Sequence, residues 1–214
     1  MRHQPSGQGV LAVTVVAIGI GYVVGSVIVG EGTAEAAGGA GPGPNDTAPD
    51  RYAYYPGTED LAPDEMRVVA CGTGMPNARP KQAAACWLVE LGNGDKFLFD
   101  IGTGSAERLS ALKIPYDYLD KVFIGHLHSD HFGDMDALWV GGVVGNRVNP
   151  MKVWGPAGHE PVFGTAYAIE HMEKMLTWDK GSRLGNVDIR GLELEVTEFD
   201  YKAVNQEIYN ENGV

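Results

Sequence analysis

The sequence predicts an α+β domain that is preceded by a transmembrane helix or signal segment. Short apolar runs bounded by Gly, Asn and Pro predict strands, and longer amphipathic stretches predict helices. A separate uncharged run near the N-terminus is long enough to cross a bilayer. The hydrophobic fraction of 44% is sufficient for a substantial core.

Composition divides the chain into four parts. Residues 1–9 form a short polar head, and residues 10–30 form the predicted membrane anchor or signal segment. Residues 31–65 are rich in Gly, Ala and Pro without an apolar period, which is typical of a linker. The folded domain is expected at residues 66–214.

Charges on either side of the apolar run predict its orientation. Arg2 precedes the run, whereas Glu31 and Glu35 follow it, so the head should be cytoplasmic and the domain periplasmic or extracellular. A cleaved signal peptide is the alternative, with residues 34–36 as the Ala-Glu-Ala cleavage site, and would make the protein secreted.

The domain should alternate strands and helices. Strands are expected at residues 66–71, 84–91, 96–101, 121–125 and 192–199. Helices are expected from about Ser105 and at residues 160–178, with an apolar side of Phe163, Tyr167 and Met175. Asn93-Gly94 predicts a hairpin turn. Cys71 and Cys86 would lie on neighbouring strands, and we expect buried free thiols rather than a disulfide.

Three histidines and one aspartate fall within a single hexapeptide that follows the apolar run at residues 121–125. In extended geometry, residues two apart point to the same side, so His126 and His128 can bind one metal ion. Asp130 and His131 lie where the chain turns and can bind a second ion beside the first. Imidazoles with a carboxylate suit a divalent cation, above all zinc, with manganese or iron as alternatives.

Asp100 ends a strand that is expected to be buried, where an unpartnered carboxylate would be costly. One interpretation is that it caps the helix that begins near Ser105. The interpretation we favour is that it holds a metal-binding histidine in the correct tautomer.

Together, several motifs resemble the metallo-β-lactamase-fold hydrolases, above all the ribonuclease Z-like and arylsulfatase-like branch, with the guanitoxin-biosynthesis type of metallohydrolase as a further candidate. The motifs are Cys71-Gly72-Thr73-Gly74-Met75-Pro76, Phe99-Asp100-Ile101-Gly102-Thr103-Gly104, the His-x-His-x-Asp-His hexapeptide and Val153-Trp154-Gly155-Pro156.

This resemblance implies an αββα sandwich, of which the chain would hold the N-terminal part, with a dinuclear centre at one edge. His126 and His128 would hold the first ion, and Asp130 and His131 the second. A hydroxide bridging the ions would be the nucleophile, and Asp130 would be the catalytic residue. Asp100 would lie behind the ligands.

The chain departs from the family because a third histidine, a bridging aspartate and a final histidine are not matched. His159 and His171 are expected to be packing or surface residues. Asn212-Gly213 is a turn signal close to the last residue, from which we expect that the domain is incomplete at its C-terminus.

Two functions of different class follow. The first is a metal-dependent hydrolase of a small ester, sulfate, phosphodiester or lactone, weakly active or inactive as this chain alone. The second is a non-catalytic remnant or metal-binding module. The net charge of −12 and the lack of basic clusters argue against nucleic acid as a partner. Gly21 and Gly25 fit a helix-packing face, which makes a homodimer an alternative to a monomer.

Overall fold

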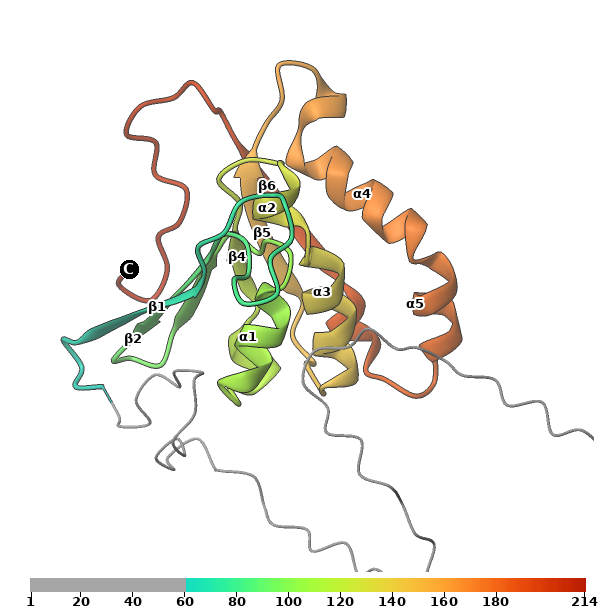
Figure 1. The fold of residues 1–214 in the computed structure, drawn as a ribbon, viewed down its shortest axis with the longest axis horizontal. Helices are drawn as coiled ribbons and strands as arrows, with labels where there is room; N and C mark the ends of the chain where they lie inside the picture. The colour runs from blue at the N-terminus through green and yellow to red at the C-terminus, as the bar shows by residue number, and fades with distance from the viewer. Residues whose placement is uncertain (1–60) are drawn as a thin grey trace, which may run out of the picture. The chain divides into compact units, whose positions relative to one another are not determined.

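The computed structural model describes residues 61–214 (Figure 1). The predicted head, the apolar run at residues 10–30 and most of the linker lie outside the described residues. Within residues 61–214, no helix combines the length and apolar character that a membrane span requires. Residues 61–65 form a turn fastened to the domain, since the carbonyl of Glu65 accepts a hydrogen bond from the Gly92 amide at 3.0 Å.

Six strands form one sheet, and their order across the sheet is their order along the chain. The strands are β1 (Met66–Gly72), β2 (Cys86–Leu91), β3 (Lys96–Phe99), β4 (Lys121–Phe123), β5 (Met151–Pro156) and β6 (Leu194–Phe199). The first three pair antiparallel, and β3 to β6 pair parallel. The mixed α/β class is thus confirmed.

Helices connect the parallel strands. The α-helices are α1 (Ser105–Ala111), α2 (Ser129–Phe132), α3 (Met135–Val144), α4 (Thr165–Met175) and α5 (Thr177–Arg183). Short 3-10 helices are η1 (Tyr116–Tyr118), η2 (Pro161–Phe163) and η3 (Ile189–Leu192). Helices α1, α3 and α4 pack on one face of the sheet, where they share a core with strand residues such as Leu88, Leu98 and Val153.

The helix predicted at residues 160–178 is three elements, η2, α4 and α5. Gly164, with extended backbone angles, separates η2 from α4, and Leu176, with non-helical angles, separates α4 from α5. Its predicted apolar side is wrong. The buried side chains of α4 are Thr165, Ile169 and Met172, whose spacing matches one helical face. The side chains predicted for that face are exposed, and they are Phe163, Tyr167 and Met175.

The opposite face of the sheet carries an aromatic group, which we call the second-face cluster: Phe97, Phe123 and Trp154. Phe123 and Trp154 stack with ring centroids 4.6 Å apart and planes inclined by 7°. Figure 1 shows the C-terminal tail on this side of the sheet, away from the helices. Tyr209 of the tail meets the rings edge-on.

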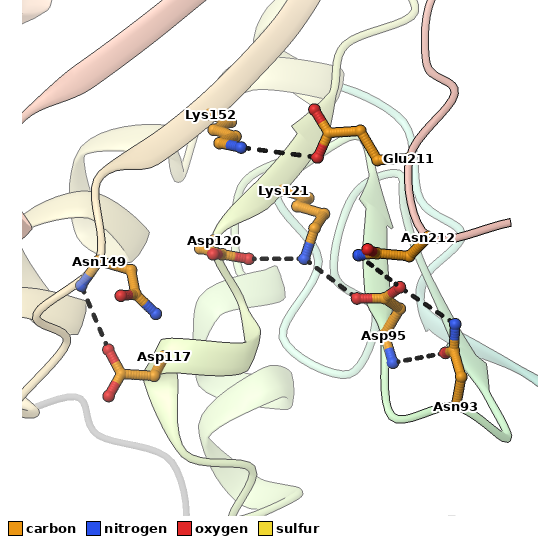
Figure 2. Close-up of polar contacts among 9 residues, drawn as sticks. All are labelled: Asn93, Asp95, Asp117, Asp120, Lys121, Asn149, Lys152, Glu211 and Asn212. Carbon is orange, nitrogen blue, oxygen red and sulfur yellow. Dashed lines mark hydrogen bonds and ion pairs between the residues drawn. The ribbon is translucent and has the colours of Figure 1, made fainter. Parts of the chain in front are cut away.

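Polar contacts hold the end of the tail against the strands (Figure 2). Glu211 lies 3.8 Å from the ammonium group of Lys152, and Asn212 donates to Asp95 at 3.4 Å. Asn212 and Gly213 have φ of 54° and 83°, so the predicted Asn-Gly turn is confirmed. The tail therefore covers part of the second face, while Trp87 and Phe99 remain 44% and 42% exposed.

The expectation of free thiols is wrong, because Cys71 and Cys86 form a disulfide with Cα atoms 5.0 Å apart. Ala70 pairs with Trp87 and Gly72 with Cys86, so Cys71 is the extra residue of a bulge in β1. The bulge brings its side chain beside Cys86. The disulfide thus joins the edge strand to its neighbour.

Arg147 is fully buried and joins the end of α3 to η3. Its guanidinium donates to the carbonyls of Leu138, Trp139 and Gly191 at 3.1, 2.8 and 3.1 Å. Burial lowers the pKa of Arg147 to about 10, which still leaves the side chain protonated at neutral pH. It therefore adds donors to two carbonyls of α3 and one of η3, and so ties these helices together.

Candidate metal centre

The predicted site residues lie at one edge of the sheet. Strands β3 and β4 are parallel, so their carboxyl ends point to the same edge. Asp100 directly follows β3, and the His-rich hexapeptide begins three residues after β4 ends. The parallel pairing therefore brings two segments 26 residues apart, from position 100 to position 126, to one place.

The hexapeptide changes from an extended segment to a helix. His128 has extended backbone angles and precedes α2, which carries Asp130 and His131. The Nε2 atom of His126 and the Nδ1 atom of His128 lie 3.1 Å apart, so both rings point to the same side. This is the arrangement that residue spacing predicts.

Among residues 61–214, His126, Asp130 and His131 form a group that could hold a metal ion, with ligand atoms all within 4.8 Å of one another. Asp130 is 7% exposed, and within the described residues its Oδ1 atom has no hydrogen-bond partner. A buried carboxylate oxygen without a partner is costly. Two imidazoles with such an oxygen fit a divalent cation. His128 contacts this group through His126.

Asp100 orients one of these histidines. Its Oδ2 atom lies 2.7 Å from Nδ1 of His131 and accepts from it, so in the neutral ring the proton is on Nδ1 and Nε2 is the atom that can bind a metal. Its Oδ1 atom accepts from the Gly125 amide at 2.8 Å. The helix-capping interpretation of Asp100 is excluded, because the N-cap of α1 is Gly104. The backbone of Asp100 has φ of 63°, a left-handed value that places the carboxylate between β4 and α2.

The electrostatic environment favours neutral imidazole at His126. Burial lowers its pKa, and the neighbouring rings of His131 and His128 lower it further. A histidine must be unprotonated to bind a metal, so the lowered pKa widens the pH range in which His126 is a competent ligand.

Two glycines allow the close approach that the site needs. A Cβ on Gly102 would lie 2.0 Å from the carbonyl oxygen of Asp130, and one on Gly133 would lie 2.2 Å from Oγ1 of Thr103. Backbone bonds fasten the same segments, since Ile101 N donates to His131 O at 2.8 Å. The loop after β3 therefore packs directly on α2.

His159 and His171 lie outside the group, as expected. His159 stacks on Phe163 with centroids 4.6 Å apart, and His171 stacks on Tyr167 at 3.8 Å. Sequence reasoning missed Gly125, whose amide holds Asp100. The available signal was its position between the strand and the first histidine.

Comparisons with known proteins show what this chain resembles. Residues 66–157 match the family described as Anti-Pycsar protein Apyc1. The matches to proteins named Ribonuclease Z confirm the resemblance to the ribonuclease Z-like branch of the metallo-β-lactamase superfamily.

Particular relatives are as follows. Ribonuclease Z of Mycolicibacterium gilvum is 31% identical over 126 residues, which are 58% of this chain and 42% of that protein. Zinc phosphodiesterase ELAC protein 1 of Mus musculus is 29% identical over 50% of this chain and 31% of its own length. The crystal structure of the short form of human tRNase Z has a TM-score of 0.46 and 21% identity, over 61% of this chain and 44% of that chain. The chain thus spans less than half the length of these relatives.

Proposed function

We propose that this chain carries the metal-binding part of a metal-dependent hydrolase. The observation that carries the proposal is the group of His126, Asp130 and His131, with an unpartnered buried oxygen on Asp130. Similarity to proteins named Ribonuclease Z supports the same reaction class.

The proposed cofactor is a pair of divalent ions, zinc in the first place. His126 and His128 would hold one ion, and Asp130 and His131 the other. Bound ions would supply a coordinated water of lowered pKa as nucleophile and would stabilise charge on the attacked centre. Among the chain's own groups, Asp130 is the proposed catalytic residue because its free Oδ1 atom is available to a proton or an ion. Asp100 fixes the ring of His131.

The proposed complete architecture is the αββα sandwich, with residues 66–214 as its N-terminal part. The support is the asymmetry of the sheet. One face lies under helices, whereas the second-face cluster is covered only in part, by Ile208 and Tyr209 among the described residues. An apolar face of this kind suits packing against a second sheet.

The proposed substrate is a small ester, sulfate, phosphodiester or lactone. The name of the mouse relative, zinc phosphodiesterase, favours a phosphodiester within this set. The net charge of −12 argues against a long nucleic acid.

We further propose that the domain lies outside the cytoplasm, held by a membrane anchor at residues 10–30 or secreted after cleavage. The disulfide between Cys71 and Cys86 supports this location, because disulfides persist in oxidising compartments.

Zinc binding tests the site. Titration of the full chain against a chromophoric zinc chelator should show binding that His126→Ala weakens by roughly 10- to 100-fold. His171→Ala is the matched control, since His171 stacks on Tyr167 away from the group. Equal zinc affinity in the wild type and in His126→Ala would contradict the site.

A non-catalytic metal-binding module is the second candidate, and the three-residue size of the group found within residues 61–214 favours it. Hydrolysis of bis(p-nitrophenyl) phosphate separates the two candidates. We expect feeble turnover by this chain alone. Feeble turnover that a chelator and His128→Ala both abolish would establish the hydrolase, whereas zinc binding with no turnover above that of the metal-free chain would favour the module.

A further inference from the structure

Two adjoining cavities lie between the loop at residues 73–85 and helix α1. Their volumes are about 280 Å³ and 320 Å³. Both are lined by Gln82 and Ala83 of the loop and by Glu107 and Arg108 of α1. We treat them as one site, the α1 cavity.

The α1 cavity has a basic lining in an acidic protein. Arg79 lines one part, Lys81 lines the other, and Arg108 lines both. Glu107 is the one carboxylate in the lining. Within residues 61–214, none of the three cations forms an ion pair, although several other cations, such as Lys174 and Arg183, do. The cavity therefore has three cations against one carboxylate, which is an excess of positive charge.

The loop is fixed by a chain of hydrogen bonds. Nη1 of Arg79 donates to Oε1 of Gln82 at 3.1 Å, and Nε2 of Gln82 donates to the carbonyl and hydroxyl of Thr73 at 3.2 and 3.1 Å. The amide of Gly74 donates to the carbonyl of Ala83 at 2.7 Å. Arg79 is thus held in place before any ligand arrives, which lowers the entropic cost of binding.

The cavity is next to the metal centre. Strands β1 and β3 both run antiparallel to β2, so the loop after β1 lies at the same edge as Asp100. The end of this loop is bonded to the segment after β3, since Ala84 N donates to Thr103 O and Gly102 N donates to Ala85 O, both at 2.9 Å. Thr103 lines the cavity on one side and packs against Gly133, just after α2, on the other. One short segment, residues 100–104, therefore separates the cavity from the ligands.

We propose that the α1 cavity binds an anionic group of the substrate, a phosphate above all, that is not the group being cleaved. Guanidinium groups bind phosphate oxygens through charge-assisted hydrogen bonds, and Arg79 and Arg108 are free to make them. This inference rests on the proposed function, because it assumes that the bound anion is part of the hydrolase's substrate. It selects a phosphodiester with a second phosphate over a neutral ester or lactone, which would leave the cations unpaired.

Binding of inorganic phosphate to the metal-free full chain tests the cavity without using activity. Isothermal titration at low ionic strength should show binding that Arg108→Gln weakens by about tenfold. Glu107→Gln should strengthen it, because it removes the one carboxylate of the lining. Lys202→Gln is the matched control, since it loses the same charge from an exposed turn after β6 and should bind phosphate as the wild type does.

Dinucleotides test whether the anion belongs to a substrate. The zinc-loaded full chain should bind thymidylyl-thymidine with a 5′-phosphate more tightly than the same dinucleotide without it, and Arg108→Gln should abolish the difference. Equal affinities in the wild type would overturn the proposal, as would an Arg108→Gln chain that binds phosphate like the Lys202→Gln chain.

The cavity and the reaction can fail separately. Phosphate binding that depends on Arg108, without turnover by the zinc-loaded chain, would support the cavity and favour the metal-binding module over the hydrolase. Chelator-sensitive turnover, together with phosphate binding that Arg108→Gln does not change, would support the hydrolase and overturn the proposed anion site.

Discussion

At the scale of single residues, the candidate site depends on a carboxylate that does not join the metal-binding group. Asp100 accepts from Nδ1 of His131 and from the Gly125 amide, so it fixes both a ring tautomer and the path of the backbone before the first histidine. Such outer partners affect metal affinity nearly as much as ligands do.

We predict that Asp100→Asn lowers zinc affinity by roughly 10- to 100-fold while the chain stays folded. The asparagine amide can donate to His131 and favour the wrong tautomer. Competition with a chromophoric chelator measures the affinity, and circular dichroism checks the fold. Asp64→Asn, at an exposed position, is the control. An unchanged zinc affinity in Asp100→Asn would show that the tautomer is fixed in another way.

In the core, the buried side chain of Arg147 has a comparable positioning role. Arg147→Met would remove three hydrogen bonds that join α3 to η3, so we expect the free energy of unfolding to fall by about 3 kcal/mol. Urea denaturation measures the loss. Arg190→Met removes an exposed arginine that pairs with Asp188 and should change stability by less than about 1 kcal/mol. Similar losses in the two variants would refute the role given to the buried guanidinium.

At the scale of elements, the disulfide fixes the edge strand β1 to β2. It closes a loop of 15 residues, for which chain entropy predicts a stabilisation of about 3 kcal/mol. We therefore expect dithiothreitol to lower the urea midpoint of the wild type. A double variant with Cys71→Ser and Cys86→Ser should have a urea midpoint near that of the reduced wild type, and dithiothreitol should not change it. A wild-type midpoint that the reductant does not move would contradict this account.

The sequence predicts elements better than their contacts. Five strands and the turn at Asn93-Gly94 follow from local apolar patterns, and the hexapeptide follows from residue spacing. The disulfide was missed because it depends on a bulge at Cys71, which is a property of strand register. The buried face of α4 was misjudged because the side chains that become buried depend on where the sheet lies, and aromatic character alone does not show this.

The same distinction, between features that follow from local sequence and features that depend on strand pairing, applies to the candidate site. The joint orientation of His126 and His128 needed only period-two geometry, whereas the bond between Asp100 and His131 needed two strands to pair in parallel. The role of Asp100 was still a sound hypothesis, because a carboxylate at the end of a buried strand requires a partner.

At the scale of the whole described domain, the two faces of the sheet differ in how they are covered. The tail covers the second-face cluster with Tyr209, whose hydroxyl is buried without a hydrogen-bond partner among residues 61–214. Burial raises the pKa of this hydroxyl. The ring therefore contributes through packing alone.

We predict that Tyr209→Phe leaves stability unchanged or slightly increased, because it removes an unpartnered polar atom. Tyr209→Ala should lower the free energy of unfolding by about 2 kcal/mol and increase binding of an apolar dye, because it uncovers aromatic rings. Glu211→Gln is the control, since its exposed ion pair with Lys152 contributes little. Equal dye binding by the Phe and Ala variants would mean that the tail does not shield the cluster.

The order of the strands has a consequence for the way the chain folds. Among the strands of residues 61–214, none inserts between two earlier ones, so each can join an edge that already exists. The antiparallel β1, β2 and β3, together with both cysteines, precede the His-rich hexapeptide in the chain. Because synthesis also proceeds from the N-terminus, we expect this part to fold and oxidise first. The metal-binding residues would then emerge onto a sheet that is already in place.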